Sequence, residues 1–518
     1  MKSFLSNTLF WGVAFILLQN GDATSQPIQL IPQKENEVIQ QPQGEDELSF
    51  SQPSLEFWEG TPPSVIETYF PKLPLRLSSP LLRGLRAQIA KEPYTNLLRN
   101  TAYETAFLSL LTEGGEVEQA KEFLLEADLP EKDSLLLDLQ WLAGDTKKAC
   151  EKVANLIRSS AQVEWKKQNI YCLYLNGEEE RAKIAAEVLN ESNPAAAQLL
   201  NMLFNEGAQP PFHQSIAKFP FLLTMWLETK QNIPESELNK LSSSSLALIA
   251  RSEKAPLHTR LLAGEKAVQQ GTFTAEDFAA LVKESPATEF WGEVAQALAS
   301  AKTEVLLPLF ERAAQQQKLG LLAQVFSSPL ASLDPSLKTL PLAPFMVQAF
   351  LQSEKNELAK KWGTFFMREA PDEAIAVRPL LHIAFPENNW DQSQIQAWQA
   401  YERRLHPLTA PQHSYEMRRI LGALGEPSGD PMKGEPAVPS WRQEKALFDG
   451  QEAPLLESAA TSHRKGEVLL LALTLIGETP LADFSVDKLV PILKALERAG
   501  YKAESRSLAL EFLLAKGS

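Results

Sequence analysis

Cysteine, histidine and basic clusters are scarce in this 518-residue sequence, and each shortage excludes a class of chemistry. No two of the six histidines have the i, i+4 spacing of a zinc site on a helix, and His406 and His413 lie seven residues apart. The glycine-rich phosphate loops of nucleotide-binding proteins and the Gly-x-Ser-x-Gly turn of hydrolases are also missing. We therefore assign no catalytic residue, metal ligand or cofactor, and we expect that the protein is not an enzyme.

Concentrated positive charge and long apolar runs are missing too. The formal net charge is −15, from 65 acidic and 50 basic residues, and no stretch is rich in Lys and Arg. Because a nucleic-acid surface must neutralise phosphates, we expect no nucleic-acid partner. Beyond residue 23 no stretch approaches about 18 consecutive apolar residues, so we expect no integral membrane segment once a signal is removed. A protein of this negative charge is expected to favour a basic or neutral partner.

The first 55 residues have two distinct compositions. Lys2, an apolar run over residues 9–18 and the small residues Gly21 and Ala23 are typical of a secretory signal peptide cleaved between Ala23 and Thr24. This pattern predicts a periplasmic or secreted protein; an uncleaved anchor or a buried N-terminal helix is the alternative. Residues 24–55 are rich in Gln, Pro and acidic residues, which predicts a disordered acidic tether.

The rest of the sequence has the pattern of an all-α protein. Apolar residues make up 44% of the chain, enough for a large core, and they recur at helical spacing. In Val117, Ala120, Leu124 and Ala127 the intervals are three, four and three residues, which describe one buried stripe. No window alternates apolar and polar residues as a strand would, so short helices separated by Gly, Pro, Asn or Ser are expected throughout.

A short motif recurs at intervals of 29 and 33 residues, at positions 115, 144 and 177. Each copy has Gly followed by an acidic residue and, five residues after the Gly, by Ala. A glycine ends one helix in a left-handed conformation, the acidic residue favours the next N-terminus, and Ala permits close crossing of two helices. The three copies are Gly115 with Ala120, Gly144 with Ala149, and Gly177 with Ala182.

This motif resembles the tetratricopeptide repeat family over about residues 95–206, with a fainter copy from Gly500 to Phe512. The family's early Trp and Leu-Gly pair are absent. The resemblance implies a superhelical solenoid of stacked helical hairpins and a partner-binding surface. The alternative is a set of unrelated hairpins that share this turn chemistry. The overall layout is also similar to exported helical-repeat proteins of alphaproteobacteria. This resemblance implies a helical-repeat architecture and does not point to any activity.

Two clusters of helix-breaking residues divide the helical region. Residues 207–211 interrupt it once, and residues 425–439, with three Gly and four Pro, interrupt it more heavily, as a linker or a functional loop. The expected organisation is a signal peptide (1–23), a tether (24–55), TPR-like helical repeats (56–206), a further helical-hairpin array (207–424), a Pro/Gly-rich linker (425–439) and a C-terminal helical bundle or cap (440–518).

The two cysteines are expected to form a disulfide. If the helix around residues 149–157 and the helix at 163–175 form an antiparallel hairpin, Cys150 lies almost opposite Cys172. An oxidising compartment permits the bond, while two buried free thiols are the alternative. The spacing is not Cys-x-x-Cys, so a redox-active site is not expected.

The tryptophans are expected to fill the interfaces between helices. For Trp390 and Trp398 exposure is the alternative, because they flank a polar helix start. On an exposed face they would be anchors for a partner.

These features favour a non-catalytic binding or scaffolding protein of the cell envelope that holds a protein partner on its helical surface. The alternative is a peptidoglycan-binding accessory, or an enzyme that resembles lytic transglycosylases, some of which carry long helical arrays. That family has Glu-Ser at its catalytic acid and a downstream Gly-Leu-Met-Gln run. Glu284 and Ser285 match only the first of these motifs, and the second is absent.

Overall fold

The computed structural model of the protein describes residues 56–97, 99–127, 129, 131–159, 162–192, 204, 212, 214–286, 288–300, 302–387, 390–439, 448 and 452–517. All of them belong to one compact unit. The expected signal peptide and acidic tether lie outside the described residues.

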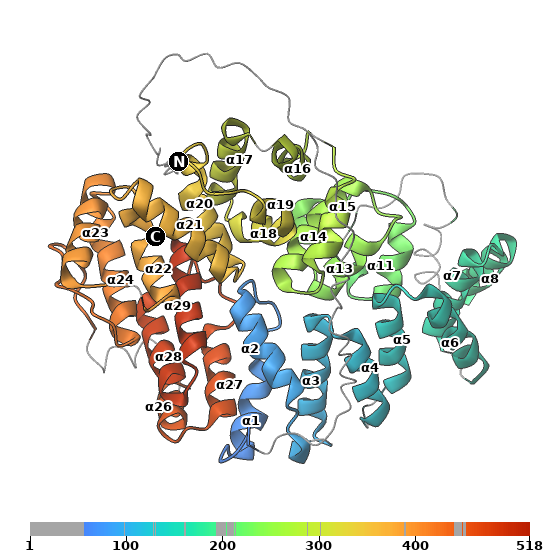
Figure 1. The fold of residues 1–518 in the computed structure, drawn as a ribbon. Coiled ribbons are helices and arrows are strands. Elements are labelled where there is room, and N and C mark those ends of the chain that lie inside the picture. The colour runs from blue at the N-terminus through green and yellow to red at the C-terminus, as the bar shows by residue number, and fades with distance from the viewer. Residues whose placement is uncertain are drawn as a thin grey trace, which may run out of the picture. The chain divides into compact units, whose positions relative to one another are not determined.

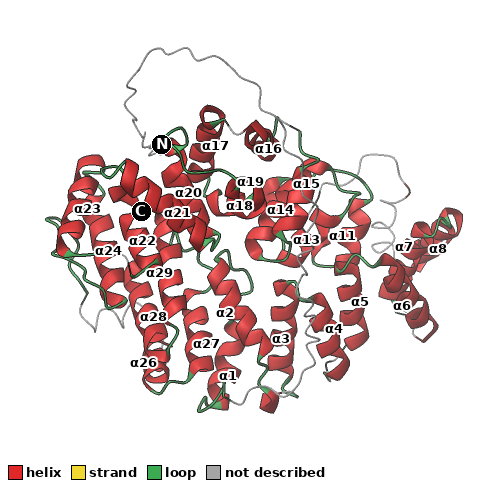
Figure 2. Cartoon of the chain, in the orientation of Figure 1, coloured by secondary structure: helices red, strands yellow, loops and turns green. Residues whose placement is uncertain are grey.

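Every regular element in the described part of the chain is a helix, which confirms the all-α prediction (Figures 1 and 2). The N-terminal elements are α1 (Pro63–Tyr69), η1 (Phe70–Lys72), α2 (Pro80–Lys91), η2 (Thr95–Leu97), α3 (Thr101–Gly114), α4 (Val117–Glu126), α5 (Lys132–Leu142), α6 (Thr146–Ser159), α7 (Val163–Leu175) and α8 (Glu179–Ser192).

The central helices are shorter on average and include several of one or two turns. They are α10 (Gln214–Ala217), α11 (Pro220–Leu227), α12 (Glu235–Leu238), α13 (Ser243–Arg251), α14 (Leu257–Gln270), α15 (Ala275–Val282), α16 (Phe290–Ser300), α17 (Thr303–Gln315), α18 (Leu319–Val325), α19 (Ser327–Ala331), η3 (Leu340–Leu342), α20 (Ala343–Gln352), α21 (Asn356–Glu369), η4 (Ala374–Val377), α22 (Arg378–Ala384), α23 (Gln392–Leu405) and α24 (Ala410–Ala423).

The C-terminal group contains four helices in the described residues. They are α26 (Glu452–Thr461), α27 (Lys465–Ile476), α28 (Val486–Ala499) and α29 (Lys502–Lys516).

Local sequence sets the ends of these helices. Asn100 caps α3, because its side-chain oxygen accepts from the backbone N–H groups of Ala102 and Tyr103 at 3.1 and 3.2 Å. Gly115 ends the same helix with φ 87°, a left-handed conformation that a side chain disfavours. Pro63 and Pro80 stand in the first turns of α1 and α2, where a missing N–H costs nothing.

Helices α3 to α8 pack in sequence order, each against the next along the chain. The C-terminal group, by contrast, packs against the beginning of the folded chain: α27 contacts α1 and α2, and α29 contacts α2, α20 and α22. Arg76 and Glu478 form an ion pair at 3.1 Å, and the N–H of Gly466 donates to the carbonyl of Phe57 at 2.9 Å. The N-terminal helices α1 and α2 are thus joined directly to the C-terminal group, a contact that the sequence does not reveal.

The core is rich in large aromatic side chains. Trp141, Trp226 and Trp362 are among the largest side chains that are sealed from solvent. Trp390 and Trp398 are only 5% and 3% exposed, so both belong to the core, and the alternative that they are surface anchors is wrong. Their polar neighbours lie at the start of α23, while the indole rings point inward.

Residues 425–439 contain no helix, yet they are fastened to the surrounding helices. Glu426 pairs with Arg506 of α29. The carboxylate of Glu435 accepts from the Nε of Arg418 in α24 at 2.9 Å. The expected linker therefore follows the surface of α24 and α29 as an anchored segment.

Asp138 in α5 is a carboxyl group without a described ion-pair or hydrogen-bond partner, and burial raises its pKa to about 6 from 3.8. A raised pKa means that the folded state holds the proton more tightly than the unfolded chain. Stability from this group is therefore full below pH 4 and is lost as the pH rises to about 6.

We expect that Asp138→Asn raises the free energy of unfolding by about 1–3 kcal/mol at pH 7.5 and changes it little at pH 3.5. Urea unfolding at the two pH values measures this difference. Asp133, which is on the same helix and pairs with Lys152 at 2.9 Å, offers the control Asp133→Asn. An equal effect of Asp138→Asn at both pH values would contradict the prediction.

Candidate binding site

Helix α2 carries two arginines on adjoining positions of one face. Ser79 caps the helix by accepting from the N–H of Leu82 at 3.0 Å, and Pro80 follows in the first turn. The three-residue spacing of Arg83 and Arg86 places both guanidiniums on the same side, toward α3 and the end of α14. Arg86 is only 4% exposed although it is charged.

Both guanidiniums are held by backbone carbonyls. The Nη1 of Arg83 donates to Ser78 at 3.0 Å and also to the carbonyl of Gln269 at the end of α14. The Nη1 of Arg86 donates to the carbonyl of Leu75. Burial lowers the pKa of both groups, that of Arg83 to about 10. The arginines thus fasten α2 to its neighbours while remaining poorly solvated cations.

A pocket of about 200 Å³ opens beside these two cations. Its wall on α2 is made of Gly84, Ala87 and Ala90, three small residues at intervals of three, and Leu110 and Leu111 of α3 form part of the opposite wall. A Cβ atom at Gly84 would meet nothing within 4 Å, so the small residues leave open space rather than close contact.

Gly271 closes the pocket at the end of α14 and needs to be glycine for two reasons. Its φ is 81°, and a Cβ atom there would lie 2.8 Å from the Nε of Arg83. A side chain at this position therefore strains the backbone and displaces the arginine.

We expect that Gly271→Ala lowers the free energy of unfolding by about 1–2 kcal/mol from backbone strain alone, with a further loss from the displaced arginine. Gly144→Ala is the matched control, because Gly144 has φ 75° and open space around its Cβ position. The two variants are compared by urea unfolding. Equal losses would show that the contact with Arg83 contributes nothing.

A second pocket of about 380 Å³ adjoins the first, and Glu116 lines both. It is formed by the turn at residues 115–116 and the start of α4 (residues 117–119), by Ala143 and by Arg251 of α13. The Nη2 of Arg251 donates to the carbonyl of Thr272 at 3.0 Å. We call these two pockets, which share Glu116, the α2 groove; Arg83, Arg86 and Arg251 are also among the residues that line it.

Of the three recurrent turn glycines only Gly115 lines this groove. Gly115, Gly144 and Gly177 all have positive φ, at 87°, 75° and 77°. Only Gly115 packs closely, since its Cβ position would be 3.2 Å from the Cα of Thr272. The following alanines, Ala120, Ala149 and Ala182, are each fully buried between helices.

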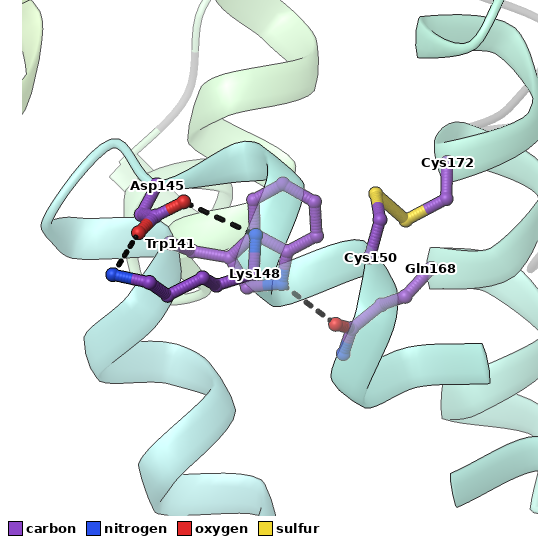
Figure 3. Close-up of a disulfide and its surroundings, with 6 residues drawn as sticks. All are labelled: Trp141, Asp145, Lys148, Cys150, Gln168 and Cys172. Atoms are coloured by element: carbon purple, nitrogen blue, oxygen red, sulfur yellow. Dashed lines mark hydrogen bonds and ion pairs between the residues drawn. A yellow bond between two sulfur atoms is a disulfide. The ribbon is translucent and has the colours of Figure 1, made fainter. Parts of the chain in front are cut away.

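Cys150 and Cys172 form a disulfide that joins α6 to α7, with their Cα atoms 5.5 Å apart, which confirms the sequence prediction (Figure 3). Beside it, the indole N–H of Trp141 donates to the side-chain carbonyl of Gln168 at 2.8 Å. These contacts tie α5, α6 and α7 together. The disulfide does not line the α2 groove.

Other candidates from the sequence do not converge on a site. The rings of His406 and His413 are 6.0 Å apart, and His413 contacts Glu402 at 2.9 Å. Within the described residues no group of three His, Cys, Asp or Glu side chains is placed to hold a metal ion. Glu284 follows α15 and pairs with Arg260 at 3.3 Å. None of the described helices is both long and apolar enough to cross a bilayer.

Sequence reasoning did not identify the arginines of the α2 groove. A signal is present, because Arg83 and Arg86 alternate with Gly84, Ala87 and Ala90 along one helix. It becomes meaningful only when the end of α14, almost 190 residues later, is known to lie beside them.

The fold and the groove define an all-helical, disulfide-bonded protein with a partly cationic surface groove. Comparison with family models, curated proteins and solved structures found no match to this chain.

Proposed function

We propose that the chain is an exported, non-catalytic scaffolding protein of the cell envelope that holds a protein partner in the α2 groove. The observation that carries this proposal is the groove itself, in which two adjoining pockets are framed by the ends of helices from separate parts of the sequence. Surfaces of this kind, with apolar walls and a few fixed polar groups, suit the side chains of a partner.

The proposal includes a TPR-like stack over α3 to α8. It is supported by the successive packing of these helices and by the three turns with left-handed glycines. In such repeats each hairpin buries the face of its neighbour and leaves an extended surface for binding. Export is proposed from residues 1–23, and the disulfide is compatible with an oxidising compartment.

Site-specific photo-crosslinking in living cells tests this function. A photoreactive amino acid replaces Gln119, which lines the groove, and in a control replaces Lys166, which is exposed on α7. We expect one or two envelope proteins to be crosslinked in near-stoichiometric amounts from position 119 and not from position 166.

The purified partner is then expected to bind the purified protein in a defined ratio. Equal crosslinking from both positions would contradict a role for the groove. Recovery of peptidoglycan fragments without any protein would instead favour the cell-wall alternative.

A further inference from the structure

The guanidiniums of the α2 groove have hydrogen-bonding capacity left for a ligand. A guanidinium has five N–H donors. In the described residues every hydrogen bond of Arg83 and Arg86 is made by Nη1, and Nε and Nη2 of both groups have no described acceptor. These nitrogens are not among the described polar atoms that are both sealed from solvent and without a partner, so they keep some exposure.

No described carboxylate pairs with either arginine within ion-pair distance, although acidic groups lie nearby: Glu511 and Glu354 act electrostatically on Arg83, and Glu113, Glu478 and the pocket-lining Glu116 on Arg86. Glu511 accepts from the N–H of Leu81 at 3.0 Å and from Ser79, and Glu113 accepts from the N–H of Ser243 at 2.9 Å. These carboxylates are oriented by their own hydrogen bonds. Burial also raises the pKa of both, which weakens them as counter-ions.

Arg86 is therefore a buried cation and Arg83 a partly buried one beside an open pocket, a combination that favours an anionic ligand. An anion that reaches Nε and Nη2 forms charge-assisted hydrogen bonds with a guanidinium, in the planar geometry that suits a carboxylate. The pocket of about 200 Å³ is large enough for one side chain and too small for a folded element.

Resting on the function proposed above, we propose that Arg83 and Arg86 bind a carboxylate of the partner protein, from an acidic side chain or from its chain terminus. The charges around the pocket determine which residues can flank that carboxylate in the partner. Glu116 lines both pockets and Glu118 lines the second, so acidic residues beside the bound carboxylate are repelled and basic ones are attracted. The inferred ligand is one acidic group within a neutral or basic segment, which agrees with the net charge of −15.

The first test uses small probes and the full exported chain at constant ionic strength. N-acetyl-glutamic acid amide represents a side-chain carboxylate, N-acetyl-alanine represents a chain terminus, and N-acetyl-glutamine amide is the neutral control. We expect ligand-observed NMR to detect binding of one of the two acids and not of the glutamine compound. The acid that binds more tightly identifies the source of the carboxylate.

Variants then locate the binding. Arg86→Gln is expected to weaken binding of the acid by about tenfold or more, since the substitution removes a charge-assisted hydrogen-bond donor. Because this arginine also supports Leu75, Gly84→Leu provides an independent test: it fills the open pocket and leaves both arginines in place. Gln88→Leu, at an exposed position of α2 that does not line the pocket, is the matched control and should bind as the wild type does.

Absence of acid binding to the wild-type protein, or unchanged binding to Gly84→Leu, would overturn the carboxylate site. The proposed function is judged separately, by the crosslinked partner. A partner that still binds Gly84→Leu with unchanged affinity rules out the carboxylate site and leaves the scaffold function intact.

Discussion

Arg464→Ala is expected to lower the free energy of unfolding by about 3–5 kcal/mol, because it leaves a buried carboxylate without its cation. Glu467 in the first turn of α27 is 0% exposed, and Arg464 is its ion-pair partner. The Nη2 of Arg464 donates to Oε1 at 3.0 Å, and Nε lies 2.8 Å from Oε2 without hydrogen-bond alignment. The loss is measured from the shift of the urea midpoint at constant slope.

Because of the position of this ion pair, its loss should also destabilise the N-terminal end of the folded chain. Gly466, between the two charged residues, donates to the carbonyl of Phe57, and its Cβ position lies 2.7 Å from the ring of Trp58. Hydrogen exchange at residues 57–60 should therefore accelerate together with exchange in α27.

A double variant separates the ion pair from the packing around it. Arg464→Met with Glu467→Leu removes both charges and keeps most of the volume, so we expect a stability within about 1–2 kcal/mol of the wild type. If Arg464→Ala alone lowers the free energy of unfolding by less than about 1 kcal/mol, then water or another group solvates the Glu467 carboxylate and the prediction is wrong.

Reduction of the disulfide is expected to destabilise the α6–α7 hairpin by about 3 kcal/mol. The bond joins residues separated by 22 positions, and closing a loop of this length removes conformational entropy from the unfolded chain. The main described packing partners of α6 are its two neighbours, α5 and α7, so α6 depends on this hairpin for much of its packing. We expect local opening of α6 and α7 to become about 100-fold more frequent in reductant.

Hydrogen exchange with and without reductant measures this effect, and α28 provides an internal reference whose exchange should not change. A Cys150→Ala, Cys172→Ala double variant should behave like the reduced protein and should not respond to reductant. Unchanged exchange in α6 and α7 after complete reduction would show that side-chain packing alone holds the hairpin.

The disulfide and the recurrent turns were predictable because both depend on local sequence. Once two helices form an antiparallel hairpin, the position of the turn sets which residues of the two helices lie opposite each other. The pairing of Cys150 with Cys172 follows from that register. Gly115, Gly144 and Gly177 adopt positive φ for an equally local reason, the absence of a Cβ atom.

The exposure of a side chain was less predictable than the presence of its helix. Trp390 and Trp398 flank a polar helix start, and from the sequence either face of α23 was a candidate for the surface. Both rings are buried: Trp390, just before α23, stacks on His382 of α22, and α23, which carries Trp398, packs against η4 and α24. In the same way, Asp138 looks like an ordinary surface carboxyl until burial raises its pKa.

The sequence by itself determined the helical class, the turn conformations and the cysteine pairing, since these depend on periodicity and on contacts between neighbouring elements. Only the tertiary structure placed α27 and α29 against α2, and brought the end of α14 beside Arg83. The α2 groove arises from those long-range contacts, which many weak apolar interactions select together and no short motif encodes.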